Sequence, residues 1–417
     1  MFRRKDPEQQ PSMWIATSDL PTTPANAFYQ RLDVAFSKFG FGDSVRALCA
    51  PFYESDTSLG GQPGIDPEVY FKMQIIGFFE NLASERAIAA RCGDSLSIRK
   101  FLHYDLHEAT PNHSSLTRIR QRLPAEVYEQ VFGLILMALK KNKLLKGKRL
   151  AIDASILEAN ASLRSLEHRL TGESYREYVK KLAAAAGVDV SDAAAVSRFD
   201  KKRPGRKTSN DEWQNPHDPD AKVGRTKRGA TRMVYKPQHL VDLDTGAIVD
   251  VDVRPGDEHD TTDLTQRILL AEERLNVALG DAPDTARIEL LIADKGYFKV
   301  DELTQLHDVE ISTVISDPIG NRRLDKLEKP QRAAVRSTGR RVGSANGKAL
   351  LRRRGELLER SFQHVLDCGG ARRTTLRGRT DIRKRYLIQA ACANLSLLMR
   401  TIFGFGTPKQ AMAALCA

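Results

Sequence analysis

The first third of the chain shows a helical pattern of apolar residues. Between residues 66 and 140, Asp66 and Pro67 supply a helix cap and a first-turn proline. Apolar residues then recur at close to helical spacing: Tyr70, Met73, Ile76 and Phe79. A second short helix is expected from Ser84, which acts as an N-cap, to the stop signal at Gly93.

The segment from Ser114 to Leu123 predicts a helix with two different faces. One face is apolar, and the other holds three arginines: Arg118, Arg120 and Arg122. Short helices joined by small turns, one of them with an arginine face, fit a helix-turn-helix-like DNA-binding unit. A small helical bundle whose arginines only face water explains the pattern equally well.

Strand patterns begin after the helical part. Leu150 to Ile152 predict a short apolar strand that ends at Asp153. A polar, Ala- and Lys-rich stretch at about 156–232 then interrupts the strand pattern. The middle of this stretch has loop composition, and we expect it to lie on the surface.

Strands return as a hairpin. Its turn is expected at Asp244-Thr245-Gly246, and the strand that follows alternates valines with Asp250 and Asp252. This alternation predicts that the two aspartates face solvent. Two helices are expected further along, from Thr262 to about Leu279 and from Ile382 to Phe403.

The segment LLIADKGYF, from Leu290 to Phe298, is a second apolar strand that ends in an aspartate, Asp294. A helix from about Val300, the strand VEISTVI and a helix around Glu359 follow it. This order predicts a mixed α/β sheet flanked by helices. We expect Asp153 and Asp294 to leave adjacent strand ends, with Glu359 reaching over from a flanking helix.

The charge balance points to a polyanionic partner. The chain has 65 Lys and Arg against 53 Asp and Glu, a net charge of +12. From Asn321 to Arg360 it carries 13 basic and only 4 acidic residues. Such a surface attracts nucleic acid by releasing condensed counterions. A solvated linker is the alternative for any single basic run.

The cysteines and the apolar stretches indicate a cytosolic protein. The five cysteines are scattered without CxxC pairs, which fits reduced residues with no zinc role. The longest apolar stretch, VFGLILMAL at Val131 to Leu139, is too short to span a bilayer. We therefore expect no membrane association.

The carboxylates permit metal-dependent phosphodiester chemistry. Two divalent ions about 3.5 to 4 Å apart activate a water or a sugar hydroxyl and stabilise the departing 3′ oxygen. Mg²⁺ and Mn²⁺ prefer oxygen ligands, which Asp153, Asp294 and Glu359 would supply. Aspartates at strand ends are also common turn and cap residues. Glu356 and Glu158 compete with Glu359 for the third position.

Three motifs resemble a known family. The stretches AIDAS, IADKGY and ERSFQHVLDCGGARRTTLRG are similar to the catalytic motifs of DDE transposases from bacterial insertion sequences, in the family-five and family-1182 groups. The helical segment before them resembles the N-terminal domain of these proteins, and RPGDEHD resembles the loop after their third strand. The resemblance runs from about residue 45 to about residue 408.

The resemblance implies a ribonuclease-H-like catalytic domain with two Mg²⁺ or Mn²⁺ ions. Asp153, Asp294 and Glu359 match its first aspartate, second aspartate and glutamate. The family often has a tyrosine and an arginine before the glutamate and a lysine after it. Here a leucine stands at the tyrosine position, no lysine follows closely, and Arg354 and His364 are stand-ins.

The expected domains follow from the motifs. They are an N-terminal extension (1–44), a helical helix-turn-helix-like DNA-binding domain (45–140), a ribonuclease-H-like domain (146–403) with a basic insertion at about 156–232, and a tail (404–417). DNA contacts are expected from the three arginines of the 114–123 helix and from further residues of the catalytic domain. The latter are Lys295, Tyr297, Arg352, Arg354, Arg360, His364, Arg372 and Arg373.

The resemblance implies a transposase that acts in the cytoplasm, at the nucleoid. It would bind the terminal inverted repeats of its element as double-stranded DNA, cleave the DNA and transfer the 3′ hydroxyl strand to target DNA. Attack at both ends requires a homodimer or a larger synaptic complex, and no nucleotide cofactor is expected. A ribonuclease-H-like nuclease without strand transfer and a catalytically silent DNA-binding regulator are the alternatives.

Overall fold

The fold is described from a computed structural model of the 417-residue chain. The first 23 residues, about half of the expected N-terminal extension, and the last two residues of the expected tail lie outside the described residues. The structure describes residues 24–53, 64–205, 209–226, 229–282, 285, 287–320 and 322–415.

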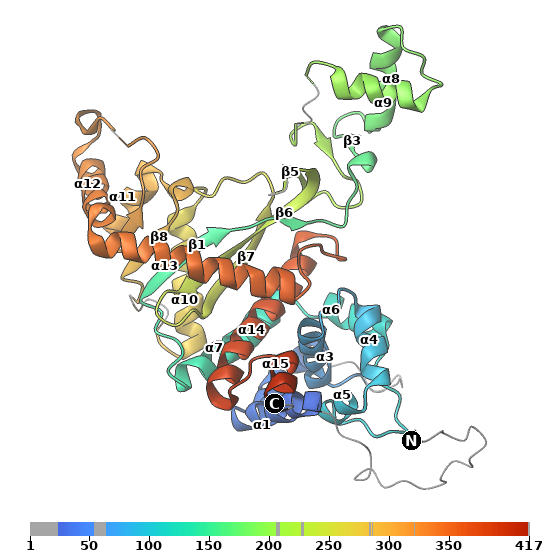
Figure 1. The fold of residues 1–417 in the computed structure, drawn as a ribbon, viewed down its shortest axis with the longest axis vertical. Coiled ribbons are helices and arrows are strands. Elements are labelled where there is room, and N and C mark those ends of the chain that lie inside the picture. Colours follow the sequence, from blue (N-terminus) through green and yellow to red (C-terminus); the bar gives the residue numbers. More distant parts are fainter. Residues whose placement is uncertain are drawn as a thin grey trace, which may run out of the picture.

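A mixed sheet forms the centre of the molecule (Figure 1). Its main strands are β1 (Arg149–Ala154), β6 (Thr231–Asp242), β7 (Ile248–Pro255), β8 (Leu290–Ala293) and β9 (Ser312–Ile315). They lie in the order β7-β6-β1-β8-β9. Strands β7, β6 and β1 pair antiparallel, whereas β8 and β9 run parallel to β1. This is the strand order of the ribonuclease-H-like fold, so the predicted fold class is confirmed.

The hairpin β6–β7 turns where the sequence predicts, but its aspartates do not face open solvent. Gly246 in the turn has a φ of 80°, a conformation that glycine adopts without strain. Asp250 pairs with Arg274 at 3.4 Å, and Asp252 pairs with Arg383 at 3.3 Å. The prediction of a solvent-facing pair is therefore wrong, because neighbouring helices bring arginines over this face of the strand.

Five helices accompany the sheet: α10 (Leu264–Leu279), α11 (Val300–Asp308), α12 (Lys329–Gly343), α13 (Ala345–Phe362) and α14 (Arg379–Phe403). Helix α13 crosses β6, β1 and β8, and α14 packs against β7. The basic run after residue 321 forms α12 and α13 in the described part of the chain. The solvated-linker alternative is thus wrong for these residues.

The N-terminal part is helical, as predicted. Its helices are α1 (Pro24–Lys38), α2 (Phe41–Tyr53), α3 (Pro67–Phe79), α4 (Glu85–Asp94), α5 (Leu96–Phe101), α6 (His113–Arg122) and α7 (Ala125–Lys141). Asp66 caps α3 and Ser84 caps α4, because each side chain accepts a backbone N–H of the first turn. Helix α14 packs against α3 and α7, and α15 (Pro408–Leu415) packs against α1. The helices and the sheet therefore share one apolar core.

One apolar helical stretch, Arg379–Ala414, is long enough to cross a membrane by length and composition alone. However, 61% of its most apolar window is buried inside the protein. Since α14 packs on α7 and β7, this stretch is a core helix.

The insertion extends from the sheet and contains more regular structure than the sequence analysis assigned (Figure 1). Its elements are β2 (Leu157–Glu158), η3 (Leu163–Ser165), β3 (Glu167–His168), α8 (Tyr175–Ala185), α9 (Ala193–Lys202), β4 (Trp213–Gln214) and β5 (Lys222–Arg225). A separate apolar cluster of Val179, Ala183 and Val196 holds α8 and α9 together. Trp213 is packed against Tyr175 and Tyr178 rather than presented to a partner.

Candidate active site

The two predicted strand-end aspartates lie at neighbouring positions. Strands β1 and β8 are parallel, and Ala151 pairs with Ile292. Two residues further along each strand, this register leads to Asp153 and Asp294. Because the carboxyl ends of parallel neighbouring strands meet at the same edge, the sheet itself brings the two side chains together.

Arg354 of α13 reaches over the sheet to both carboxylates. Its Nη2 lies 2.8 Å from Oδ2 of Asp153 and 3.9 Å from Oδ2 of Asp294. The same guanidinium donates to the Ile152 carbonyl oxygen at 3.4 Å. Only 11% of the Arg354 side chain is exposed, against 31% for Asp153 and 47% for Asp294. The guanidinium of Arg354 thus pairs with both aspartates in a partly desolvated environment.

Burial raises the pKa of Asp153 above its usual value. Arg354 and the N–H of Ala154 act in the opposite direction, whereas the nearby charges of Asp294 and Asp260 add to the rise. Desolvation and like charges both disfavour a bare carboxylate. The site therefore favours a positive charge beside Asp153, whether a guanidinium or a metal ion.

Asp294 also starts the short helix η4 (Lys295–Tyr297), where it accepts the Gly296 N–H at 2.8 Å. Lys295 is exposed beside it, as expected for a DNA contact. Tyr297 is fully buried, and its hydroxyl accepts a hydrogen bond from Gln238 at 2.7 Å. The prediction that Tyr297 faces DNA is wrong in this structure, because its ring completes the core beneath the site.

The loop after β7 adds a carboxylate that the sequence analysis did not count among the ligands. Asp260, in the RPGDEHD motif, lies 2.8 Å from Lys236 Nζ and close enough to raise the pKa of Asp153. A Cβ at Gly296 would lie 3.6 Å from Asp260 and 3.0 Å from Asp294. The RPGDEHD motif pointed to this residue, but the spacing of the motif along the chain does not reveal that Asp260 lies near Asp153 and Asp294.

Glu359 does not join the aspartates. The sheet-facing side of α13 carries Arg354, Leu358 and Ser361, and Glu359 lies about 100° further around the helix than Leu358. It is exposed and makes no side-chain hydrogen bond or ion pair with any residue that the structure describes. Over the same residues, no group of three or more His, Cys, Asp or Glu could hold a metal.

The competing glutamates are engaged elsewhere. Glu356 is exposed and forms an ion pair with Arg360 at 2.5 Å, while Glu158 lies 3.5 Å from Arg232. Asp153 and Asp294 are therefore the pair that the structure brings together, and the third ligand stays a prediction.

A buried histidine fixes α13 on the sheet. His239 of β6 pairs with Asp153 across the strands. Its Nδ1 lies 2.6 Å from Ser361 Oγ on α13, and its Nε2 lies 2.7 Å from the Tyr386 hydroxyl on α14. Burial lowers the pKa of His239 to about 3, so its ring is neutral. This role could not be predicted from the sequence, because the three residues are far apart along the chain.

The predicted DNA-binding cations fall into two groups. The exposed members are Arg118, Arg122, Lys295, Arg352, Arg360, Arg372 and Arg373. Arg120 is instead buried between Glu85 and Asp381, so its assignment to a DNA-facing surface is wrong. His364 is mostly enclosed against Phe78, and burial lowers its pKa to about 4. It is uncharged at neutral pH and does not replace a family lysine.

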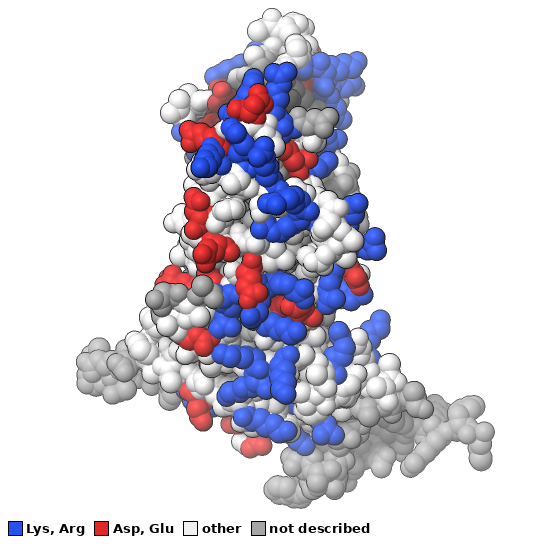
Figure 2. Space-filling view, turned by 90° about the vertical axis from the view of Figure 1, so that its left-hand side faces the viewer, with Lys and Arg blue, Asp and Glu red and all other residues white. Residues whose placement is uncertain are grey.

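Basic side chains are also spread over one face of the molecule. Figure 2 shows one face of the molecule on which Lys and Arg side chains outnumber Asp and Glu and extend over its full height. A face of this kind attracts a polyanion without selecting a sequence.

The family comparisons cover both parts of the chain. Residues 22–122 match the family described as Transposase domain (DUF772), and residues 145–395 match the Transposase DDE domain family. No curated protein matches the sequence. Among solved structures, the Mos1 transposase paired-end complex with left transposon end has 11% identity, with 74% of this chain and 82% of that chain covered. Its TM-score of 0.21 is too low to contribute to the assignment.

The strand order and the paired strand-end aspartates define a ribonuclease-H-like catalytic domain. The DDE match covers more than half of the chain, which therefore belongs to the Transposase DDE domain family. The protein is a DDE-type transposase of the insertion-sequence type, and the predicted resemblance is confirmed. The narrower grouping with family five or family 1182 stays a prediction.

Proposed function

We propose that this transposase binds the terminal inverted repeats of its element, cleaves DNA with two divalent metal ions and transfers the 3′ hydroxyl strand to target DNA. The observation that carries the proposal is the pair Asp153 and Asp294, held by Arg354 at the ends of adjacent parallel strands. Membership in the DDE family supports the reaction class.

The donor set fits a divalent cation. Asp153 and Asp294 offer hard carboxylate oxygens, and both already share one cationic partner. Mg²⁺ or Mn²⁺ bound there would activate the attacking oxygen and stabilise the leaving 3′ oxygen. The family motif assigns the third ligand to Glu359, whereas Asp260 lies closer to the pair in this structure.

The residues of the chain have separate roles in this proposal. Asp153 and Asp294 would hold the cations, and Arg354 beside them would pair with a DNA phosphate. Lys295, which is exposed beside Asp294, binds a phosphate nearby, while His239 and Ser361 keep α13 in position. A homodimer or larger synaptic complex brings both element ends together in the cytoplasm, at the nucleoid, without a nucleotide cofactor.

The test is a cleavage and joining assay on DNA that carries the element ends, with Mg²⁺ or Mn²⁺. We compare the native protein with Asp294→Asn and with a matched control, Asp308→Asn, whose side chain is exposed at the end of α11. We expect nicked and joined products from the native protein and the control, and neither product from Asp294→Asn.

Other outcomes separate the alternatives. Nicking without joining would identify a nuclease. DNA binding without nicking, equal in the native protein and Asp294→Asn, would identify a regulator and remove the catalytic assignment.

A further inference from the structure

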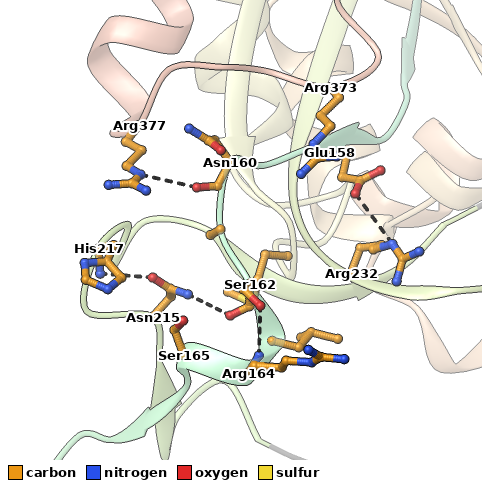
Figure 3. Close-up of a pocket in the computed structure, with 13 residues that line it drawn as sticks. Glu158, Asn160, Ser162, Arg164, Ser165, Asn215, His217, Arg232, Arg373 and Arg377 are labelled. Carbon is orange, nitrogen blue, oxygen red and sulfur yellow. Dashed lines mark hydrogen bonds and ion pairs between the residues drawn. The ribbon is translucent and has the colours of Figure 1, made fainter.

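A polar cavity lies between the sheet and the base of the insertion (Figure 3). It has a volume of about 520 Å³. Its charged lining comes from Glu158, Arg164, Arg232, Arg373 and Arg377. These side chains belong to β2, η3, β6 and the segment before α14, so the cavity forms only where the insertion joins the sheet.

The cavity has an excess of positive charge. Glu158 is its only acidic lining residue, and that carboxylate lies 3.5 Å from Arg232. Arg377 donates to the Asn160 carbonyl oxygen at 3.3 Å. The side chains of Arg164 and Arg373 make no hydrogen bond or ion pair with any described residue. At least two guanidinium groups are thus available to an anion.

A second cavity, of about 610 Å³, adjoins this one. The two share Glu158, Arg232 and Arg373 in their linings. The second is also lined by Ser155, two residues beyond Asp153. Together they form a groove, here called the arginine groove, that runs from Ser155, just beyond the strand end that carries Asp153, to the insertion.

Backbone contacts hold the walls of the arginine groove in place. The Glu158 N–H donates to the Arg372 carbonyl oxygen at 2.9 Å, and the Thr374 N–H donates to the Glu158 carbonyl oxygen at 2.9 Å. The Asn160 side chain donates to the Thr375 carbonyl oxygen at 2.9 Å. The segment that carries Arg373 and Arg377 is therefore tied to β2 before any ligand binds, which lowers the entropy cost of binding.

We propose that the arginine groove binds an unpaired DNA strand that continues from the cleavage site, with Arg373 and Arg377 contacting its phosphates. Volumes of about 520 and 610 Å³ are within the range of pockets that hold a ligand the size of a nucleotide. Guanidinium groups pair with phosphate oxygens in a fork geometry. The proposal rests on the proposed function, which places DNA at Asp153 and Asp294.

The test compares binding to two fluorescein-labelled probes in EDTA. One is a blunt duplex, and the other has the same sequence with an unpaired extension on one strand, made with each polarity. The variant is Arg373→Ala/Arg377→Ala. The matched control is Arg176→Ala/Arg198→Ala, which removes two exposed arginines from α8 and α9.

The native protein and the control should prefer the extended probe. The groove variant should lose about tenfold or more in affinity for that probe only. The slope of log affinity against log salt should fall by about 1.4 for two lost contacts to a single strand. Unchanged affinity and slope, or an equal loss on the blunt probe, would overturn the proposal.

Two controls keep the result interpretable. If the double variant melts at a lower temperature than the native protein, Arg377→Gln alone is tested, since its side chain has a single long contact with the Asn160 backbone. Cleavage by the native protein is measured separately. If the native protein cleaves DNA but the groove variant binds both probes as the native protein does, only the proposal for the arginine groove is contradicted. If binding depends on the unpaired extension but the native protein does not cleave, only the proposed reaction is contradicted.

Discussion

The strand ends that carry the two aspartates and the helix that carries the glutamate differ in how tightly the sequence specifies them. Asp153 and Asp294 are positioned by hydrogen-bonded register between β1 and β8. Glu359 depends on the rotation of α13 about its own axis, which is set by contacts such as Ser361 with His239. The end of each strand is set by the residues within it, so parallel pairing of the two strands is enough to bring the aspartates together. Helix rotation is decided by packing against distant residues.

The largest effect on activity is expected when each candidate for the third metal ligand is removed in turn. This tests whether the glutamate on α13 acts together with the strand-end aspartates. We expect Glu359→Gln to lower strand joining by about a thousandfold, because a lost metal ligand costs several kcal/mol of transition-state stabilisation. Glu356→Gln serves as the control, since that side chain is exposed and paired with Arg360. Joining is measured on end-containing DNA with Mg²⁺.

If Glu359→Gln loses joining activity to the expected extent, α13 must rotate when DNA and metal bind, so that Glu359 reaches the aspartates. If Asp260→Asn is inactive while Glu359→Gln stays active, the role passes to Asp260, and the structure already has the productive arrangement.

The next largest effect is expected on stability, when Arg354 of α13 is removed from Asp153 and Asp294. Arg354→Ala leaves Asp153 without its partner in a place where burial already raises its pKa. We expect a loss of about 3 kcal/mol in the free energy of unfolding, at the lower end for breaking a buried pair because Asp153 is partly exposed. Urea unfolding at pH 7 measures it, with exposed Arg352→Ala as the control.

Saturating Mg²⁺ should restore part of the lost stability in Arg354→Ala by occupying the same place. If Arg354→Ala and Arg352→Ala unfold alike with and without Mg²⁺, Arg354 is not the cation that holds the two carboxylates.

The smallest expected effect is on the pH dependence of stability, and it tests whether His239 fixes α13 on the sheet. Its folded pKa of about 3 lies below the ordinary value of 6.5, so its contribution to stability is complete above pH 6.5 and is lost as the pH falls toward 3. Between pH 6.5 and 5 the native protein should lose about 2 kcal/mol from this group. Urea unfolding should show a shallower pH dependence for His239→Gln.

His364→Gln is the comparison variant, because burial lowers that pKa only to about 4 and the ring packs against Phe78 of α3. An identical pH dependence in native protein and His239→Gln would show that His239 is protonated without cost.

Local signals made much of the fold predictable. Asp66 and Ser84 cap the helices that they were expected to start, and the apolar runs before Asp153 and Asp294 form strands. These features depend on residues within a few positions of each other. The mixed sheet, with the two aspartates at adjacent strand ends, then followed from the order of elements along the chain and the family motifs.

The remaining features depend on contacts that spacing does not reveal. Arg120 looked like part of an exposed arginine face, but it pairs with Asp381, 261 positions away. The rotation of Glu359 depends on His239, which is 122 positions from its partner Ser361. Helices α8 and α9 went unassigned because a cluster of only three buried apolar residues holds them, too few for a clear periodic signal.

The insertion leaves and re-enters the sheet at one place. Leu157 and Glu158 of β2 pair with Tyr235 and Val234 of β6, so the chain departs and returns on two neighbouring antiparallel strands. A short turn could close that gap without altering the register of β1 and β6. The position of Asp153 at the end of β1 therefore depends on the pairing of β1 with β6 and β8, and not on the length of the insertion.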